Sequence, residues 1–200
     1  MRRVQLALWL LAGIAAIAGL VLALNPPEPG SKAPATSELP IASIGGPFTL
    51  TGSDGRPFAS SRLAGKPAAI FFGFTHCPDV CPTTLARLAK LRRQLGQGDD
   101  GFAIIFITVD PARDKPADVG RYAALFDTPV IGLTGSQADI DRVKKQFGVY
   151  SEQTPLPGGD YGVSHTAAVF LLSRDGKFVA TIAPDEPDAI AHDKLKRIAA

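Results

Sequence analysis

Two cysteines, Cys77 and Cys81, are the only thiols in the chain, and both lie in the segment GFTHCPDVCP. An apolar run of strand length precedes this segment, and a helical pattern follows it. Two thiols at a strand-to-helix turn can share a soft metal ion or can form and break a disulfide. Both reactions use the thiolate, and we expect the positive end of the helix dipole to lower the pKa of such a thiol.

The chain after residue 47 alternates between strand and helix patterns. The apolar runs at residues 68–74 and 102–109 predict strands, the second of them buried on both faces. Leucines at positions 85, 88, 91 and 95 predict the apolar face of a helix that ends at Gly96. The other expected elements are a hairpin over residues 48–58, helices over 116–126, after Ser136 and over 187–198, a strand over 130–133 and a hairpin over 167–182. This order predicts an α/β fold around a mixed sheet, and a cysteine pair between the first core strand and its helix is typical of a thioredoxin-like fold.

The N-terminus has the composition of a membrane anchor. Residues 4–24 are apolar except for Gln5, and Arg2 and Arg3 precede them. As a helix this run is about 31 Å long, which matches the hydrocarbon thickness of a bilayer. A cleavable signal peptide is the alternative, although its apolar region is normally only about 7–15 residues long. We expect residues 1–24 to form one transmembrane helix, with the two arginines in the cytoplasm and the rest of the chain outside it.

A linker and a single domain are expected to follow. Residues 25–47 contain six prolines and no apolar periodicity, which predicts an extended tether. Residues 48–200 then form the globular domain. The formal net charge of +2 and the absence of a basic stripe with interleaved aromatic residues argue against nucleic acid as a partner.

The spacing of the cysteines leaves both chemistries open. Three residues separate them, whereas thioredoxin-type oxidoreductases use two. The loop is too short for a disulfide to remove much entropy from the unfolded chain, so a structural staple is disfavoured. A redox pair of Cys77 and Cys81 and a shared metal ion both remain possible on spacing alone.

His165 favours the metal. It follows glycines in GGDYGVSHT, which reads as an adaptable loop that enters an apolar strand. Two thiolates and one imidazole make a soft, three-coordinate set that suits copper and leaves zinc short of its fourth ligand. An ordinary loop histidine is the alternative for His165. His76 neighbours Cys77, and adjacent residues of an extended segment point to opposite sides, so we expect it to support the ligands and not to bind.

Three segments resemble the Sco/SenC family of membrane-tethered copper-delivery proteins that help to assemble cytochrome c oxidase. They are GFTHCPDVCPTTL, FITVDPARDKP and YGVSHTAAVFLLSRDGKF, and the likeness extends from about residue 48 to residue 198. The resemblance implies a thioredoxin-like fold with inserted β-hairpins and copper ligands at Cys77, Cys81 and His165. It also implies that Asp79 orients a ligand or a partner by hydrogen bonding. Asp110 and Asp114 match family positions too, and we expect that pair to shape a loop.

The resemblance also implies a location and partners. The chain would be a single-pass protein of the inner membrane, with its domain facing the periplasm. It would act on the copper-binding subunit of cytochrome c oxidase and exchange copper with other periplasmic copper carriers. The chain has no methionine after Met1, so no thioether can relay copper.

Three functions compete. The leading hypothesis is a metallochaperone that holds one copper ion, as Cu(I) or Cu(II), and passes it to the binuclear copper centre of the oxidase. The alternative is a thiol–disulfide reductase that keeps the oxidase's copper-site cysteines reduced. A peroxidase is weaker, because Phe74 occupies the position where that chemistry usually needs Thr or Ser. A basic cluster on the helix after the cysteines, at positions 87, 90, 92 and 93, is expected to be a solvated face.

Overall fold

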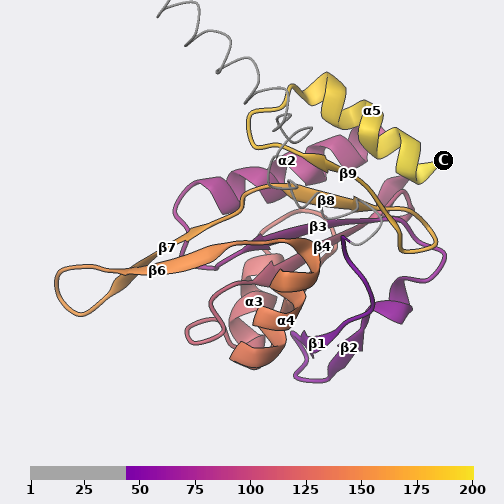
Figure 1. Ribbon diagram of the computed structural model, residues 1–200. Coiled ribbons are helices and arrows are strands. Elements are labelled where there is room, and N and C mark those ends of the chain that lie inside the picture. The colour runs from indigo at the N-terminus through magenta and orange to yellow at the C-terminus, as the bar shows by residue number, and fades with distance from the viewer. Residues whose placement is uncertain (1–43) are drawn as a thin grey trace, which may run out of the picture. The chain divides into compact units, whose positions relative to one another are not determined.

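The computed structural model describes residues 44–200, which contain a seven-stranded sheet and a separate two-stranded sheet (Figure 1). The predicted anchor and the linker up to residue 43 lie outside the described residues. Within residues 44–200, no helix has both the length and the apolar character that a membrane crossing requires. The strands are β1 Thr49–Gly52, β2 Pro57–Ala59, β3 Ala68–Gly73, β4 Ala103–Thr108, β5 Val130–Thr134, β6 Ser151–Pro155, β7 Tyr161–His165, β8 Val169–Leu172 and β9 Phe178–Ile182.

The main sheet has the strand order β2-β1-β5-β4-β3-β8-β9. Its centre is parallel: β3 pairs with β4 from Ala68↔Ala103 to Gly73↔Thr108, and β4 pairs with β5 in the same direction. All six residues of β3 and all six of β4 are buried, as expected for strands covered on both faces. The carboxyl ends of these strands therefore meet at one edge, where the loops after β3 and β4 lie.

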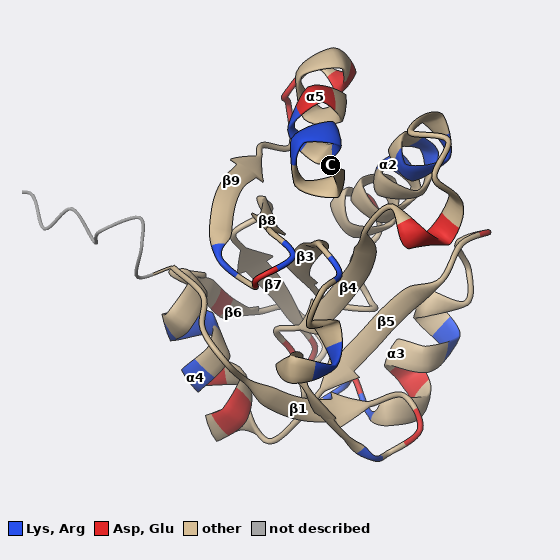
Figure 2. Cartoon of the chain, turned by 90° about the vertical axis from the view of Figure 1, so that its right-hand side faces the viewer, with Lys and Arg blue, Asp and Glu red and all other residues tan. Residues whose placement is uncertain are grey.

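Helices cover both faces of the sheet. They are α2 Val80–Gln94, α3 Pro116–Ala123, α4 Gln137–Phe147 and α5 Asp188–Ala199. Figure 2 shows α2 and α3 on one side of the central strands and α4 on the other. The aromatic core follows this division, because Phe72 packs on Phe147 of α4, whereas Phe106 packs on Tyr122 of α3. The predicted α/β thioredoxin-like architecture is confirmed.

Two predicted helices differ from the structure in detail. The helix expected to reach residue 126 ends at Ala123. Phe126 belongs to the apolar pattern because its ring packs on Tyr122 with the centroids 5.6 Å apart, from beyond the helix end. The predicted solvated basic face of α2 is wrong for Arg92, which is 2% exposed. Its guanidinium donates to the carbonyl oxygens of Phe102 and Pro129, so it joins α2 to the loops around it.

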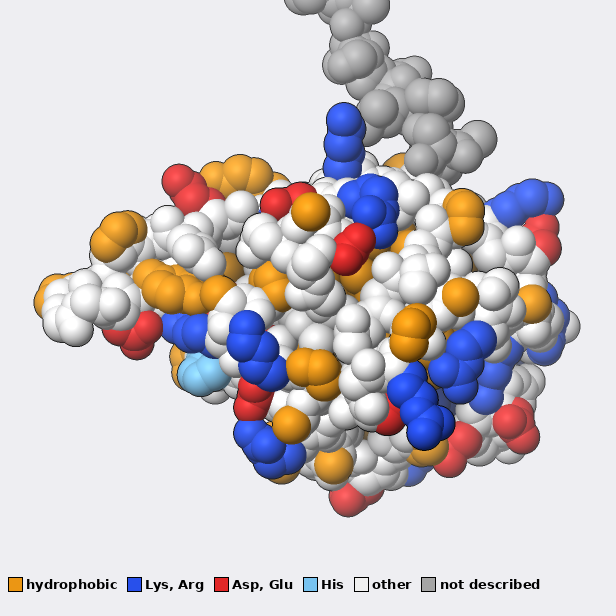
Figure 3. Space-filling model, turned by 90° about the horizontal axis from the view of Figure 1, so that it is seen from below, with side chains coloured by type: hydrophobic (Ala, Val, Ile, Leu, Met, Phe, Trp, Pro, Cys, Tyr) orange, Lys and Arg blue, Asp and Glu red, His pale blue; other side chains and the backbone are white. Residues whose placement is uncertain are grey.

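The glycine-rich loop predicted over residues 158–166 is a loop only in part, because residues 158–160 lie in a turn and residues 161–165 form a strand. Residues 161–165 form β7, which pairs antiparallel with β6 from Ser151↔His165 to Pro155↔Tyr161. This β6–β7 hairpin extends away from the main sheet (Figure 1) and stands out from the body of the domain in the space-filling view (Figure 3). His165 is its last residue, so the hairpin ends where the main sheet resumes.

Candidate metal centre

The two cysteines lie where the edge of the sheet meets the first turn of α2. β3 ends at Gly73, Cys77 lies in the loop, and Cys81 lies in the first turn of the helix. The backbone N–H of Cys77 donates to the carbonyl of Phe74 at 3.2 Å, and the backbone N–H of Cys81 faces the Cys77 sulfur at 3.5 Å. Pro82 follows within the first turn, where a missing N–H costs the helix nothing. These local contacts bring the two thiol groups close together at the start of α2.

His165, the last residue of β7, lies next to the two thiol groups. Its Nε2 atom lies 3.5 Å from the Cys81 sulfur, although 84 residues separate the two in the chain. The ligand atoms of Cys77, Cys81 and His165 all lie within 4.8 Å of one another. Among residues 44–200, this is the only group of three or more His, Cys, Asp or Glu side chains with such proximity.

The imidazole of His165 is held in one orientation. Its Nδ1 atom lies 3.0 Å from the carbonyl oxygen of Thr166. A carbonyl only accepts, so Nδ1 carries the proton and Nε2 keeps its lone pair toward the sulfurs. The rings of Phe71 and Phe74 meet the imidazole edge to face, with centroids 6.0 Å and 5.8 Å away. This arrangement suits an Nε2 metal ligand.

Burial controls the protonation of the site. Removal from water raises the pKa of the Cys81 thiol, which is completely buried, and this effect exceeds the opposing hydrogen bond from the backbone of Phe74. The expectation of a lowered pKa is therefore wrong for Cys81, whose pKa is raised overall. Burial also lowers the pKa of His165, against the hydrogen bond to Thr166. Both groups are neutral near pH 7, so a metal ion that binds here must displace the thiol proton.

The two residues predicted to support the ligands lie outside the cluster. His76 is exposed, and its Nδ1 atom is 3.5 Å from a carboxylate oxygen of Asp114. Asp79 precedes α2, and its carboxylate accepts from the hydroxyl of Thr83 at 3.3 Å. Within the described part of the chain, Asp79 makes no hydrogen bond to the three clustered side chains.

The arrangement can support two kinds of chemistry. Two sulfurs and one imidazole nitrogen are soft donors, a set that copper accepts readily and that leaves zinc without the fourth ligand of a structural site. Both cysteines are free thiols in the structure, and their proximity also allows a disulfide to form after a small movement.

Sequence reasoning missed the residues that orient His165. Thr166 acts through its carbonyl oxygen, which every residue possesses, so no sequence signal identifies it. Phe71 and Phe74 belong to an apolar run that predicts a buried strand and its end, and nothing in that run shows that two of its rings face a histidine.

Comparison with known proteins identifies relatives over most of the chain. The SCO1/SenC family model matches residues 36–200. The mitochondrial protein SCO2 of Saccharomyces cerevisiae is 33% identical over 172 residues, which cover 84% of this chain and 57% of that protein. The chain spans only 42% to 64% of the length of the first three such relatives.

Solved structures match as well. The copper-bound structure of ScoI from Bradyrhizobium japonicum is 43% identical, has a TM-score of 0.70, and covers 78% of this chain and 99% of its own. BsSco, a member of the Sco family of cytochrome c oxidase assembly proteins in which a disulfide switch has been identified, is 26% identical with a TM-score of 0.62, and covers 80% of this chain and 95% of its own. The fold, the paired cysteines that open α2 and the match over residues 36–200 lead to one conclusion: the chain belongs to the SCO1/SenC family.

Proposed function

We propose that this protein is a metallochaperone that binds one copper ion through the sulfurs of Cys77 and Cys81 and the Nε2 atom of His165. The observation that carries the proposal is the convergence of these three soft ligand atoms within 4.8 Å. The copper-bound structure of a relative that is 43% identical supports the choice of metal. The two thiolates are the ligands that Cu(I) prefers, and the imidazole extends the set to Cu(II).

We further propose that the recipient is the binuclear copper centre of cytochrome c oxidase, on its copper-binding subunit. The relation to a family of oxidase assembly proteins supports this recipient. The apolar run at residues 4–24 supports a membrane anchor, and residues 25–47 support a tether that holds the domain, residues 48–200, in the periplasm. Other periplasmic copper carriers are the expected donors.

A second function, thiol–disulfide reduction, is favoured by one observation. Cys77 and Cys81 are free, close together and partly accessible through Cys77. As a reductase, the protein would transfer two electrons and two protons from its dithiol to a disulfide of the oxidase's copper site, and its own cysteines would form a disulfide. This reaction needs both sulfurs and does not need His165.

Replacing His165 by alanine separates the two functions. We expect the His165→Ala protein to lose Cu(II) binding and to retain most Cu(I) binding, because two thiolates can hold Cu(I) without the imidazole. Oxidation of the dithiol should be nearly unchanged. In cells, the variant should lose oxidase activity at low copper and recover part of it when copper is added, since mass action partly replaces a carrier.

The matched control is His192→Ala, because His192 lies on α5 outside the metal cluster. The measurements are copper titrations with electronic and magnetic spectra, and oxidase activity at low and high copper. Normal oxidase assembly in the His165→Ala strain at low copper would overturn copper delivery. Rescue of the cysteine variants by an added thiol reductant, but not by copper, would support the reductase.

A further inference from the structure

The loop after β4, residues 109–115, lies between the two segments that carry the clustered ligands. Its two acidic residues, Asp110 and Asp114, are completely buried. A buried carboxylate is costly unless charged or hydrogen-bonded partners surround it. Besides Arg113 and Thr108, the partners of these two carboxylates come from the strand that carries His165 and from the loop that carries Cys77.

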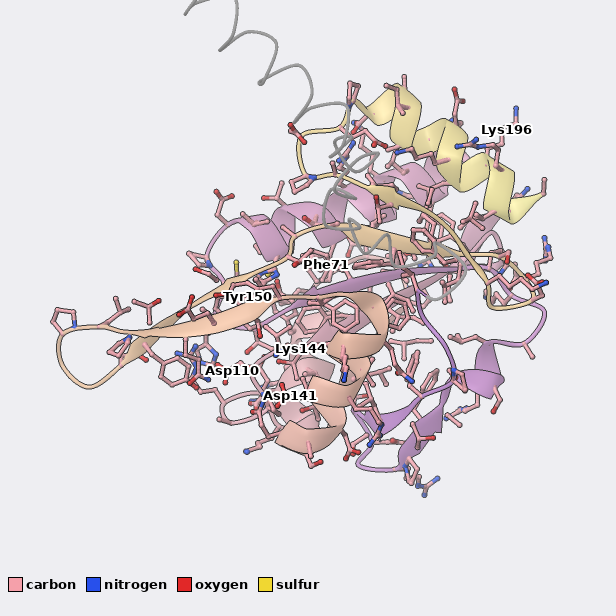
Figure 4. The ribbon with its side chains drawn as sticks, viewed as in Figure 1. Phe71, Asp110, Asp141, Lys144, Tyr150 and Lys196 are labelled. Atoms are coloured by element: carbon pink, nitrogen blue, oxygen red, sulfur yellow. The ribbon has the colours of Figure 1, made fainter. Side chains whose placement is uncertain are left out.

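Asp110 and Arg113 hold the beginning of β7. The hydroxyl of Tyr161 donates to one oxygen of Asp110 at 2.8 Å, and Nε of Arg113 donates to the other at 2.5 Å. A terminal nitrogen of Arg113 donates to the carbonyl of Tyr161 and to the carboxylate of Asp160, both at 3.1 Å. The guanidinium also lies over the Tyr161 ring, 3.8 Å from its centroid. Figure 4 shows Asp110 beneath the hairpin in this region.

Arg113 also contacts the cysteine segment. Its guanidinium carbon lies 6.0 Å from the ring centroid of Phe74, and that ring meets the imidazole of His165 edge to face. Phe74 accepts, through its carbonyl, the backbone hydrogen bond from Cys77. One side chain thus contacts the strand that ends at His165 and the residue that begins the cysteine loop.

Asp114 binds the loop that carries Cys77. It accepts from the backbone N–H and the hydroxyl of Thr75 at 2.9 Å and 2.6 Å, and from the hydroxyl of Thr108 at 2.6 Å. Thr108 is the last residue of β4, so the cysteine loop is fixed to the rigid centre of the sheet. Asp110 and Asp114 thus do more than shape their own loop: Asp110 also binds the first residue of β7, and Asp114 also binds the loop that carries Cys77.

The β6–β7 hairpin has little burial of its own to stabilise it. A two-stranded hairpin by itself is at best marginally stable in water. Four of the five residues of β6 are exposed, so this strand contributes little burial. Charge-assisted hydrogen bonds to a buried carboxylate are stronger than neutral ones, and the forked guanidinium adds directional specificity. Arg113 and Asp110 together provide polar contacts between the loop after β4 and Tyr161, the first residue of β7.

We propose that Arg113 is a positioning residue for the metal centre: through Tyr161 and Phe74 it holds the strand of His165 against the cysteine loop. This proposal rests on the proposed copper function for its metal-binding consequence. Its structural content, the attachment of β7, stands apart from copper. Loss of the attachment leaves the two sulfurs in place and releases the imidazole.

The test uses variants that change Arg113 in graded ways. Arg113→Lys keeps the charge and loses the fork, Arg113→Ala removes both, and Tyr161→Phe keeps the ring and loses only the hydroxyl that donates to Asp110. The matched control is Arg121→Ala, which removes an exposed ion pair with Asp118 on α3. Circular dichroism establishes that each variant is folded, and Arg113→Lys and Tyr161→Phe keep the test decisive if Arg113→Ala does not fold.

Two readouts separate positioning from general destabilisation. In the copper-free, reduced protein, amide hydrogen exchange in β6 and β7 should become about tenfold faster in Arg113→Lys and faster still in Arg113→Ala, while exchange in β3 and β4 stays unchanged. Cu(II) affinity should fall about 10- to 100-fold, as for other residues that orient a ligand, and Cu(I) affinity should fall much less. Tyr161→Phe should show a smaller change of the same pattern.

Each outcome decides the proposal. Exchange rates and Cu(II) affinity equal to those of the Arg121→Ala control would overturn it. Faster exchange with unchanged Cu(II) affinity would also overturn the positioning role. If the unaltered protein binds no copper, the proposed function fails, and the exchange rates alone then show whether Arg113 holds the hairpin.

Discussion

At the scale of single residues, the imidazole of His165 is oriented by contacts that do not involve the cysteines. The carbonyl of Thr166 accepts a hydrogen bond from Nδ1–H, and the rings of Phe71 and Phe74 restrict the plane of the imidazole. The side-chain entropy of this histidine is therefore lost on folding and not on metal binding, which favours affinity. Burial of the imidazole also lowers the pKa of His165, which keeps Nε2 unprotonated.

The buried thiol of Cys81 predicts how stability depends on pH. The unfolded thiol ionises near pH 9.0, whereas burial raises the pKa of the folded one. Above pH 9 the unfolded chain therefore binds fewer protons than the folded protein, and the free energy of unfolding falls as pH rises, by up to about 1.4 kcal/mol per pH unit. Below about pH 9 the thiol is protonated in both the folded and the unfolded chain, so its ionisation does not reduce the free energy of unfolding there.

The measurement is denaturant unfolding of the reduced, copper-free protein between about pH 8 and pH 10.5. Cys81→Ala should show a shallower decline than the unaltered protein. The control Cys77→Ala keeps the buried thiol and should decline almost as steeply as the unaltered protein, because burial raises the pKa of Cys81 more than the contacts with Cys77 do. Equal slopes for Cys81→Ala and the unaltered protein would contradict the prediction.

Gly73 provides the space that the Cys81 sulfur occupies. A Cβ atom at Gly73 would lie 2.9 Å from that sulfur and 2.9 Å from a ring carbon of Phe106. Gly73→Ala should destabilise the protein by about 1–3 kcal/mol through overpacking, and should weaken copper binding because the sulfur is displaced. In Gly162→Ala, the nearest atom to the new Cβ is 3.9 Å away, so this control should bind copper normally. Unfolding and copper titrations of both variants provide the comparison, and equal behaviour would be inconsistent with the close packing.

At the scale of elements, the hairpin that carries His165 is the part that pattern reasoning did not identify. Residues 151–155 have the sequence SEQTP, which lacks the alternation of apolar and polar residues that indicates a strand. The glycines near His165 indicate a loop. The pairing of β6 with β7 rests on backbone hydrogen bonds and on one anchored tyrosine, which side-chain periodicity does not report. By contrast, β3 and β4 were predictable because burial on both faces requires a continuous apolar run. Helix α2 was predictable because burial on one face leaves apolar residues at helical spacing.

At the scale of the whole molecule, the N-terminal apolar run predicts the topology of the full chain. A reporter that is active only outside the cytoplasm should be active when fused after Ala200, and the mature protein should still begin near Met1 and sediment with membranes. The same fusion to a chain that begins at residue 44 should be inactive, because it lacks the run. A soluble product whose N-terminus lies near Leu24 would contradict the anchor and support a cleaved signal peptide.

The order of α/β elements and the position of two cysteines at the start of a helix could be predicted from the sequence, which also made His165 a candidate third ligand. Periodic burial and residue chemistry are local properties, so they can be read along the chain. The approach of His165 to Cys81 across 84 residues could be known only from the folded chain. The same holds for the contacts of Arg113 with Tyr161 and of Asp114 with Thr75, and for the burial that raises the pKa of the Cys81 thiol. These properties depend on distances between segments and on exclusion of water, which arise only when the chain is folded.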